Sequence, residues 1–126
     1  MSFAAWCAFL LGASIGAPLR YIVDLSVQSR IGTGRPYGTL IVNAVGSLVL
    51  GVVAGLARDG NLAPWAEIAI GTGFCGALTT FSTFAFETVR LAERGDAGAA
   101  IAHIGMNTAF AITLAAAGYA AASGLG

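Results

Sequence analysis

Long apolar runs alternate with short polar stretches along the chain. Charged side chains are absent from residues 1–19, 36–57, 68–86 and 97–126. A helix that crosses a bilayer core of about 30 Å needs about 20 apolar residues, so each run is long enough to span a membrane. The runs lack the strict alternation that is typical of membrane-spanning strands. The pattern predicts one all-α membrane domain over residues 1–126, with four transmembrane helices at approximately 3–23, 37–57, 65–89 and 97–122.

The composition agrees with a membrane environment. Hydrophobic residues make up 57% of the chain and charged residues only 10%, and the mean hydropathy is +0.82. Soluble domains carry about 25% charged residues, so this chain cannot cover a water-facing surface. The first run lacks the positively charged start of a signal peptide, and we expect it to be a retained helix.

Aromatic and basic residues indicate how the helices sit in the bilayer. Amphipathic rings prefer the headgroup level, and the expected helix ends carry Trp6, Tyr21, Tyr37, Trp65 and Tyr119. We expect loops at 24–36, 58–64 and 90–96, and Pro64 is well placed to start the third helix. Four spans put both termini on one side of the membrane. That side carries Arg58, whereas the other carries Arg20, Arg30, Arg35, Arg90 and Arg94. The positive-inside rule therefore favours termini on the outside.

Glycine and cysteine positions favour close helix packing. Gly12–Gly16 and Gly51–Gly55 are small-xxx-small patterns, which let helix backbones approach closely. Cys7 and Cys75 differ in expected depth, so we expect free thiols that pack in the bundle rather than a disulfide or a metal site. Residues 71–76 match G-x-G-x-x-G, but a dinucleotide site needs a preceding strand and a βαβ unit, which does not fit an apolar run followed by another.

Polar side chains inside the spans are costly in lipid and usually face protein or water. Asn43 and Ser47 lie one turn apart in the second span. His103 and Asn107 lie one turn apart in the fourth, so each pair shares a helix face. Arg20 ends the first span. Hydrogen bonding between helices explains each residue alone, whereas the whole set, with no carboxylate at mid-depth, suggests a polar path across the membrane.

The segment Gly76–Phe84, GALTTFSTF, is the least helix-like part of the third span. Its threonines and serine have poor helix propensity. A membrane helix breaks only where protein, ions or water satisfy the freed backbone groups, so we expect a break near residues 76–80, buried at an interface. Carbonyls exposed at such a break make a cation site. Phe81 and Phe84 share a face, and their electropositive ring edges can meet an anion.

Three segments have the order and spacing of a known family: Gly16–Arg20, GTLIVNAVGS (38–47) and GFCGALTTFSTFAFETVRL (73–91). In these segments the chain resembles the Fluc (CrcB) family of fluoride channels. The T-T-F-S-T-F-x-x-E pattern is long and unusual, which makes the signal specific, and the fourth span matches more loosely. The resemblance implies a multi-pass channel of the bacterial inner membrane, not an enzyme, that lets fluoride leave the cell and so protects it from fluoride toxicity.

The resemblance also implies an architecture and residue roles. Family members are antiparallel homodimers of dual topology, with two fluoride pores at the subunit interface. The residues implied to line the pore are Phe81, Phe84, Asn43, Ser82, Thr83, Thr80, His103, Asn107 and Arg20. The two phenylalanine rings would meet fluoride by their edges, Asn43 would donate to it, and Arg20 would lie near the aqueous vestibule. Backbone carbonyls of Gly76 and Thr79 are implied to hold a structural Na⁺ on the dimer axis.

Other functions and partners fit parts of the pattern. A small multidrug antiporter has four spans and a similar length, but its coupling needs a buried carboxylate, which residues 1–19 lack. A membrane hydrolase using Ser82 and His103 would need an orienting acid and an oxyanion hole. A passive scaffold is the third alternative. Within the family pattern, Ala111 stands where a hydroxyl residue is common, so we expect a shorter polar lining in the fourth span. The unequal numbers of arginines on the two sides of the membrane would also suit a heterodimer with a second chain whose arginines favour the opposite orientation.

Overall fold

The computed structural model describes residues 1–32 and 36–124. Every regular element in these ranges is a helix: α1 (Phe3–Ile31), α2 (Tyr37–Arg58), α3 (Pro64–Ala66), η1 (Glu67–Cys75), α4 (Gly76–Leu78), α5 (Ser82–Glu93) and α6 (Ala97–Ser123). The η1 segment is a π-helix, whose turns are wider than those of an α-helix. The elements α3 to α5 together form one of four helical stretches that are long and apolar enough to cross a membrane. The all-α prediction with four candidate spans is confirmed.

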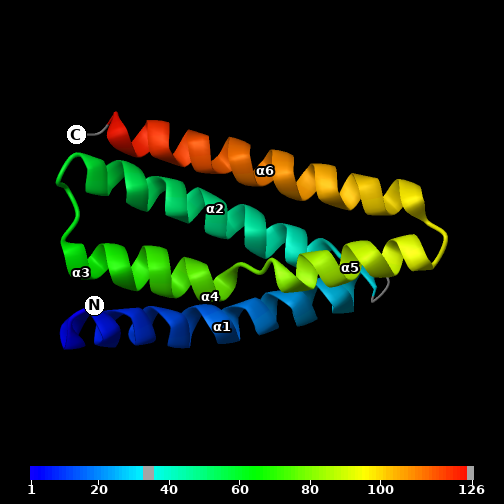
Figure 1. The fold of residues 1–126 in the computed structure, drawn as a ribbon, viewed down its shortest axis with the longest axis horizontal. Coiled ribbons are helices and arrows are strands. Elements are labelled where there is room, and N and C mark those ends of the chain that lie inside the picture. The colour runs from blue at the N-terminus through cyan, green and yellow to red at the C-terminus, as the bar shows by residue number, and fades with distance from the viewer. Residues whose placement is uncertain (33–35, 125–126) are drawn as a thin grey trace.

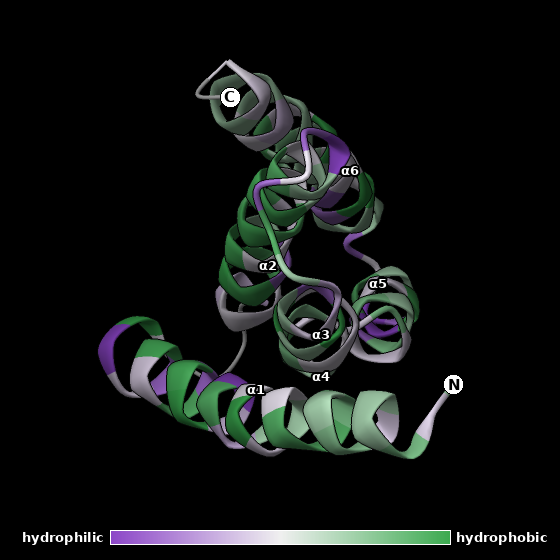
Figure 2. Cartoon of the chain, turned by 90° about the vertical axis from the view of Figure 1, so that its left-hand side faces the viewer, coloured by the Kyte–Doolittle hydropathy of each residue, from purple (hydrophilic) through white to green (hydrophobic). Residues whose placement is uncertain are grey.

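The helices form a bundle in which α1 crosses the others obliquely. Figure 1 shows α2 and α6 side by side, with the α3–α5 stretch next to them. Figure 2, which looks along the bundle, shows α1 lying across its lower side. The most extensive packing joins α2 to α6 and α1 to η1. The start of α1 and the end of α6 lie at one end of the bundle together with the 59–63 loop, and the 94–96 turn lies at the opposite end (Figure 1).

Two of the expected loops are shorter than the sequence suggests. Residues 24–31 are helical, and so are residues 90–93, so the loop bounds 24–36 and 90–96 are wrong. Polar side chains end an apolar run without ending a helix, because they can pair along it: Gln28 donates to Asp24, one turn earlier, at 2.8 Å. The third stretch does begin at Pro64, as predicted. Arg35, which enters the argument on orientation, lies outside the described residues.

Glycines allow the backbones to touch where helices cross. A Cβ atom on Gly12 would overlap a backbone carbonyl of η1. A Cβ atom on Gly55 would lie 2.7 Å from a backbone carbonyl oxygen of α6. Backbone atoms cannot move aside as a flexible side chain can, so these contacts require glycine. The interpretation of Gly12–Gly16 and Gly51–Gly55 as packing motifs is confirmed.

The G-x-G-x-x-G match at residues 71–76 has the same explanation. It lies in η1 and at the start of α4, and a Cβ atom on Gly73 would overlap the Phe9 carbonyl of α1. Cys75, in the same segment, is buried, whereas Cys7 is exposed, and both are free thiols. Gly73 of this motif therefore serves helix packing, whereas a Cβ atom on Gly76 would meet nothing within 4 Å. Cys75 packs in the interior as expected, but the exposed Cys7 does not.

We expect Gly12→Val to destabilise the bundle strongly. The new side chain would meet the η1 backbone, and overpacking typically costs about 1–3 kcal/mol even where side chains can yield. Gly105 on α6 is the matched control, because a Cβ atom there meets nothing within 4 Å. Unfolding in detergent should show Gly12→Val less stable by about 3 kcal/mol or more, with Gly105→Val close to wild type. Equal stability of the two variants would contradict the close α1–η1 packing.

Large apolar side chains are exposed on the outside of the bundle. Figure 2 shows hydrophobic residues along all of the long helices. Phe3, Leu11 and Ile101 are 85%, 67% and 70% exposed. Soluble monomers rarely expose so much apolar surface in one piece. Trp6 and Trp65 are also exposed near helix starts, where the headgroup region would solvate them. The surface therefore suits lipid contact, and the small interior is filled mainly by glycine, alanine and valine.

Candidate functional site

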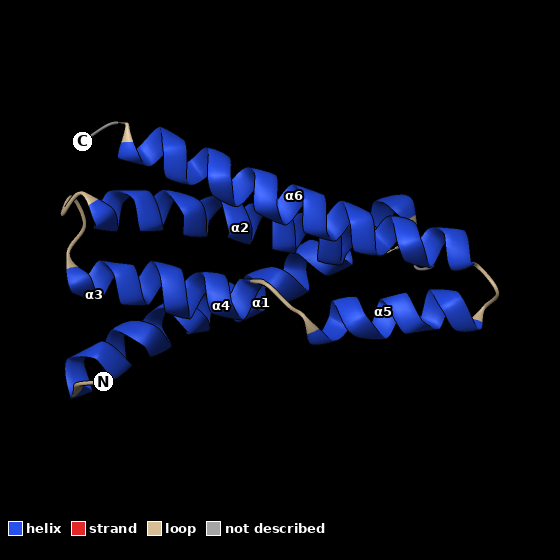
Figure 3. Ribbon diagram, turned by 45° about the horizontal axis from the view of Figure 1, so that its top comes forward, coloured by secondary structure: helices blue, strands red, loops and turns tan. Residues whose placement is uncertain are grey.

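The third helical stretch is interrupted at residues 79–81. Helix α4 ends at Leu78, Thr79 is extended with φ −78° and ψ 159°, and α5 begins at Ser82. Figure 3 shows this interruption as a short loop between α4 and α5. The Thr79 N–H and hydroxyl both donate to the Cys75 carbonyl, at 2.9 and 2.8 Å. The chain thus leaves α4 with its last turn closed and crosses to α5 in extended form.

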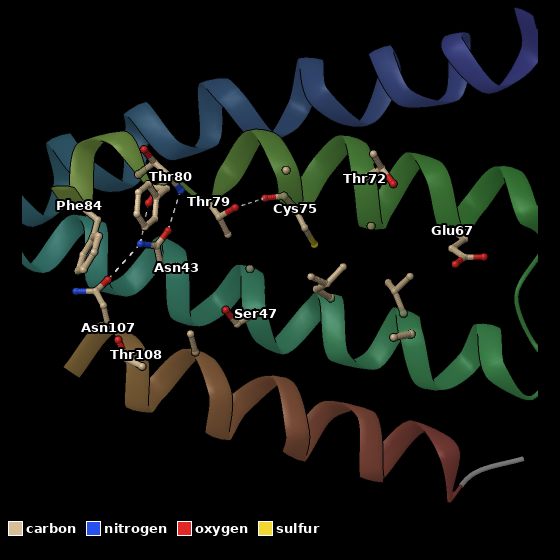
Figure 4. A pocket seen from close by; sticks show the side chains of 18 residues that line it. Asn43, Ser47, Glu67, Thr72, Cys75, Thr79, Thr80, Phe84, Asn107 and Thr108 are labelled. Carbon is tan, nitrogen blue, oxygen red and sulfur yellow. Dashed lines mark hydrogen bonds between the residues drawn. The ribbon is translucent and has the colours of Figure 1, made fainter. Parts of the chain in front are cut away.

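Asn43 of α2 satisfies the backbone that the interruption exposes. Its Oδ1 accepts the Thr80 N–H at 2.8 Å, and its Nδ2 donates to the Thr80 carbonyl at 3.0 Å. In a continuous helix the Thr80 N–H would instead bond the Gly76 carbonyl, four residues earlier. The second Nδ2 hydrogen is directed to Asn107 Oδ1 at 3.2 Å. Figure 4 shows these hydrogen bonds of Asn43 at one end of a groove. Asn43 therefore makes hydrogen bonds between helical stretches, as the sequence analysis allowed, and its partner is the interrupted backbone itself.

The hydroxyl groups of the third span organise the start of α5. Thr80 Oγ1 accepts the Thr83 N–H at 3.1 Å and donates to Thr83 Oγ1 at 3.0 Å. Ser82 Oγ lies 3.4 Å from Thr80 Oγ1. A threonine that accepts from the N–H three residues later acts as an N-cap, which replaces a missing helical hydrogen bond. These three side chains remain partly or fully exposed, so they can also contact a ligand.

Phe81 and Phe84 lie together at the interruption. Their ring centroids are 5.7 Å apart, with an angle of 48° between the planes. Phe81 is 79% exposed, whereas Phe84 is half-buried and lies 5.3 Å from the His103 ring. One aromatic side chain thus projects from the subunit, and the other lines its interior.

His103 and Asn107 of α6 are buried and bonded to each other. Each is 6% exposed. Asn107 Nδ2 donates to the His103 carbonyl at 2.9 Å and lies 3.1 Å from His103 Nδ1. Since Asn107 Oδ1 accepts from Asn43, a continuous hydrogen-bonded chain runs from the Thr80 peptide to the imidazole. The structure brings the predicted residues Asn43, Thr80, His103 and Asn107 together.

Two cavities adjoin this chain. The larger, of about 670 Å³, is an open groove between α2, the η1–α4 segment and α6, and Figure 4 shows many of its side chains. Its lining includes Asn43, Gly76, Thr79, Phe81, Phe84 and Asn107. The smaller cavity, of about 190 Å³, is lined by Arg20 together with Thr39, Thr80 and Thr83. Arg20 is therefore separated from the phenylalanines and meets the hydroxyl cluster from the α1 side.

Thr39 and Glu87 join the site although the sequence analysis did not assign them to it. The buried Thr39 hydroxyl donates to Glu87 Oε1, and the same oxygen lies 3.8 Å from His103 Nε2. A signal was present for Thr39, which precedes Asn43 by one turn and shares its face. Ala111 lines the larger groove, so the α6 wall does become apolar one turn beyond Asn107.

Possible cation ligands at the interruption are carbonyl oxygens. The described residues contain no group of three or more His, Cys, Asp or Glu side chains that could hold a metal ion. Gly76 lines the groove, and the Thr80 N–H that its carbonyl would accept in a continuous helix donates to Asn43 instead. Carbonyl oxygens suit hard cations. The donor set is therefore compatible with the Na⁺ that the family resemblance implies.

Comparison with known proteins identifies relatives of the whole fold. The family model described as CrcB-like protein, Camphor Resistance (CrcB), matches residues 7–119. A Streptomyces avermitilis protein named fluoride-specific ion channel FluC 1 is 47% identical over 112 residues, covering 84% of this chain and 90% of that one. A Frankia casuarinae protein of the same name is 45% identical over 122 residues, covering 93% and 95%. Shewanella halifaxensis has a protein named fluoride-specific ion channel FluC that is 42% identical over 102 residues, covering 81% and 82%. The matched region includes all four helical stretches and the interruption.

Proposed function

This chain belongs to the CrcB-like family, and from that membership we propose that it is a fluoride-specific channel of the bacterial membrane. The family is one of ion channels rather than enzymes, and the four apolar helical stretches make the chain a multi-pass membrane protein. Fluoride leaves the cell passively, down its electrochemical gradient, and the cell is protected from its toxicity. The observation that carries the proposal is the hydrogen-bonded chain Thr80–Asn43–Asn107–His103 beside Phe81 and Phe84.

In the proposed path the anion passes between hydrogen-bond donors and ring edges. Fluoride approaches through the cavity lined by Arg20 and meets the hydroxyls of Thr80, Ser82 and Thr83. Asn43 then donates to it by releasing its longer hydrogen bond, the 3.2 Å contact with Asn107. The edges of Phe81 and Phe84 carry positive potential without a formal charge that would trap the ion. His103 and Asn107 extend the polar lining along α6.

We further propose that two antiparallel copies form the working channel, with two pores at their interface. A single subunit leaves Phe81 79% exposed and its larger groove open. Burial of an aromatic side chain of this size against a partner would stabilise a dimer. A second copy over the groove would cover Asn43 and Thr80, which one subunit leaves partly exposed. Dual topology supplies the opposite orientation that this arrangement needs.

The proposed dimer carries one Na⁺ held by the backbone carbonyls of Gly76 and Thr79 from both copies. The ion would be coordinated by carbonyl oxygens that converge where the two interrupted helices cross, and it would offset the repulsion between their partial negative charges. Support comes from the freed Gly76 carbonyl and from the exposed position of Gly76, around which a Cβ atom would meet nothing within 4 Å. Room therefore remains for a partner backbone at this point.

Replacing Na⁺ by N-methylglucamine is expected to weaken the dimer in detergent. An ion that binds only the assembled state stabilises it by about 2.7 kcal/mol at a hundredfold excess over its dissociation constant. Thermal unfolding monitored with size-exclusion chromatography measures the loss. In a Cys7→Ala, Cys75→Ala background, Gly76→Cys should crosslink between subunits, and Gly105→Cys should not. A fully active monomer, or a dimer that is indifferent to every monovalent cation, would refute this arrangement.

Fluoride efflux from liposomes distinguishes the proposed channel from the small multidrug antiporter. A channel releases fluoride as soon as charge balance is provided by a potassium ionophore, and it needs no opposing proton gradient. An antiporter would move organic cations against protons and leave fluoride inside. Efflux no faster than from protein-free vesicles would refute the channel.

A further inference from the structure

The hydrogen bonds around His103 determine which of its ring nitrogens carries the proton. Asn107 Nδ2 faces the His103 carbonyl, which can only accept, so the orientation of the Asn107 amide is fixed. The same Nδ2 lies 3.1 Å from His103 Nδ1, which must then accept. A neutral imidazole with an accepting Nδ1 carries its proton on Nε2. The chain that starts at the Thr80 peptide thus presents an Nε2–H group at its far end.

That Nε2–H group is buried and lacks a partner. His103 Nε2 is the only buried side-chain nitrogen or oxygen without a hydrogen bond in the part of the chain that the structure describes. Glu87 Oε1 lies 3.8 Å away, too far for a hydrogen bond but close for two charges. The His103 side chain is 4% exposed and that of Glu87 24%, so the pair meets solvent on the side of the carboxylate.

Few other charged groups face this pair. From α5 the charged neighbour is Glu87 itself, and from α1 Asp24 acts on Glu87 electrostatically. Arg20, also on α1, lines a cavity with Thr39. Helix α2 contributes the uncharged Thr39 and Asn43, and α6 has no charged residue besides a protonated His103. A proton gained here would therefore meet one nearby counter-charge, the Glu87 carboxylate.

We propose that Glu87 and His103 form a proton-responsive pair that raises fluoride conduction when the medium becomes acidic. While His103 is neutral, Glu87 accepts from Thr39 and the pair carries one negative charge. The His103 ring of the pair lies 5.3 Å from the Phe84 ring. A proton that binds His103 Nδ1 displaces the contact from Asn107 Nδ2, which keeps its bond to the His103 carbonyl. The resulting imidazolium can donate from Nε2–H to Glu87 as a charge-assisted bond. The pair becomes neutral overall. Removing a negative charge beside the path lowers the repulsion that an anion meets.

The effect on conduction rests on the proposed fluoride path and is measured as current. Planar bilayers with purified protein are recorded at about pH 7.5 and about pH 5.5, which bracket the ordinary titration range of histidine. Current counts the anion and excludes neutral HF, which crosses lipid unaided. Wild type should carry about fivefold more fluoride current at the lower pH, the low end of coupling between linked sites. Each variant is compared with its own current at the higher pH.

Three variants isolate the pair. His103→Gln keeps an N–H group near the Nε2 position but cannot take up a proton, so its current ratio should be close to one. Glu87→Gln removes the counter-charge, and since a buried cation without a partner is costly, its ratio should also be close to one. Glu93→Gln, at the exposed end of the same helix, should keep the wild-type ratio. A flat wild type, or a His103→Gln variant that keeps the response, overturns the proposal.

Nuclear magnetic resonance tests the protonation of Glu87 and His103 without a measurement of conduction. The chain has one histidine, so a ring-nitrogen label reports His103 alone. The neutral ring should show its proton on Nε2, and the Glu87 carboxyl carbon should shift over the same pH interval as the ring. In His103→Gln the Glu87 signal should stay constant over that interval. A proton on Nδ1, or a Glu87 signal that moves without His103, refutes the pair. Absent current at both pH values would instead refute the fluoride channel.

Discussion

Asn43→Asp is expected to abolish fluoride flux. A carboxylate in place of the amide would face the Thr80 carbonyl and Asn107 Oδ1, both of which only accept. It would also repel the anion that Asn43 is proposed to bind. Two like charges at about 4 Å with an effective dielectric constant of about 20 repel by about 4 kcal/mol, which corresponds to roughly a thousandfold in binding. Efflux of fluoride from liposomes measures the loss.

Asn43→Ser distinguishes repulsion of the anion from the loss of the hydrogen bonds that Asn43 makes to the Thr80 peptide. Serine is too short to reach both ends of the Thr80 peptide, so this variant loses the bonds donated by Nδ2 and also the bond from the Thr80 N–H, which an aspartate could still accept. It introduces no charge. Each buried group left unpaired costs about 1–3 kcal/mol of stability. We therefore expect the serine variant to be less stable than wild type but to keep measurable flux. Equal flux in the two variants would mean that Asn43 serves packing and not the anion.

Phe81→Ile and Phe84→Ile should each reduce fluoride flux by up to about tenfold, because quadrupole interactions of a ring are worth up to about 1.5 kcal/mol. Isoleucine keeps much of the apolar volume but has no electropositive edge. Phe81 is 79% exposed in the subunit, so its replacement should leave the fold of the single chain intact. Fluoride efflux is the readout for both variants.

Phe110→Ile is the matched control for the ring variants. Phe110 lies on α6, is 46% exposed, and does not line the larger groove. Its replacement should leave flux near the wild-type level. If Phe81→Ile and Phe84→Ile both conduct like the control, ring edges have no part in conduction.

The bilayer makes the four helical stretches predictable from sequence, whereas the local bonding of the site is not. Apolar length alone identifies the spans, and a spacing of four residues places His103 and Asn107 on one face. Outside the bilayer, apolar length no longer determines where a helix ends. For that reason the polar residues of segment 24–31 predict a loop where the structure has a helix. Asn43 and Thr80 are 37 residues apart, so the hydrogen bonds between them depend on how α2 is rotated about its axis relative to the interruption. The pairing of Thr39 and Glu87 likewise needs two helix rotations at once, which no periodicity in one segment reveals.

Simultaneous recording of fluoride and chloride efflux from the same proteoliposomes tests the central claim most directly. Vesicles loaded with both anions and opened to potassium by an ionophore should release fluoride through wild-type protein and retain chloride. Vesicles with Asn43→Asp protein should retain both anions. Release of chloride alongside fluoride would contradict a fluoride-specific channel, and retention of fluoride by wild-type vesicles would contradict a channel altogether.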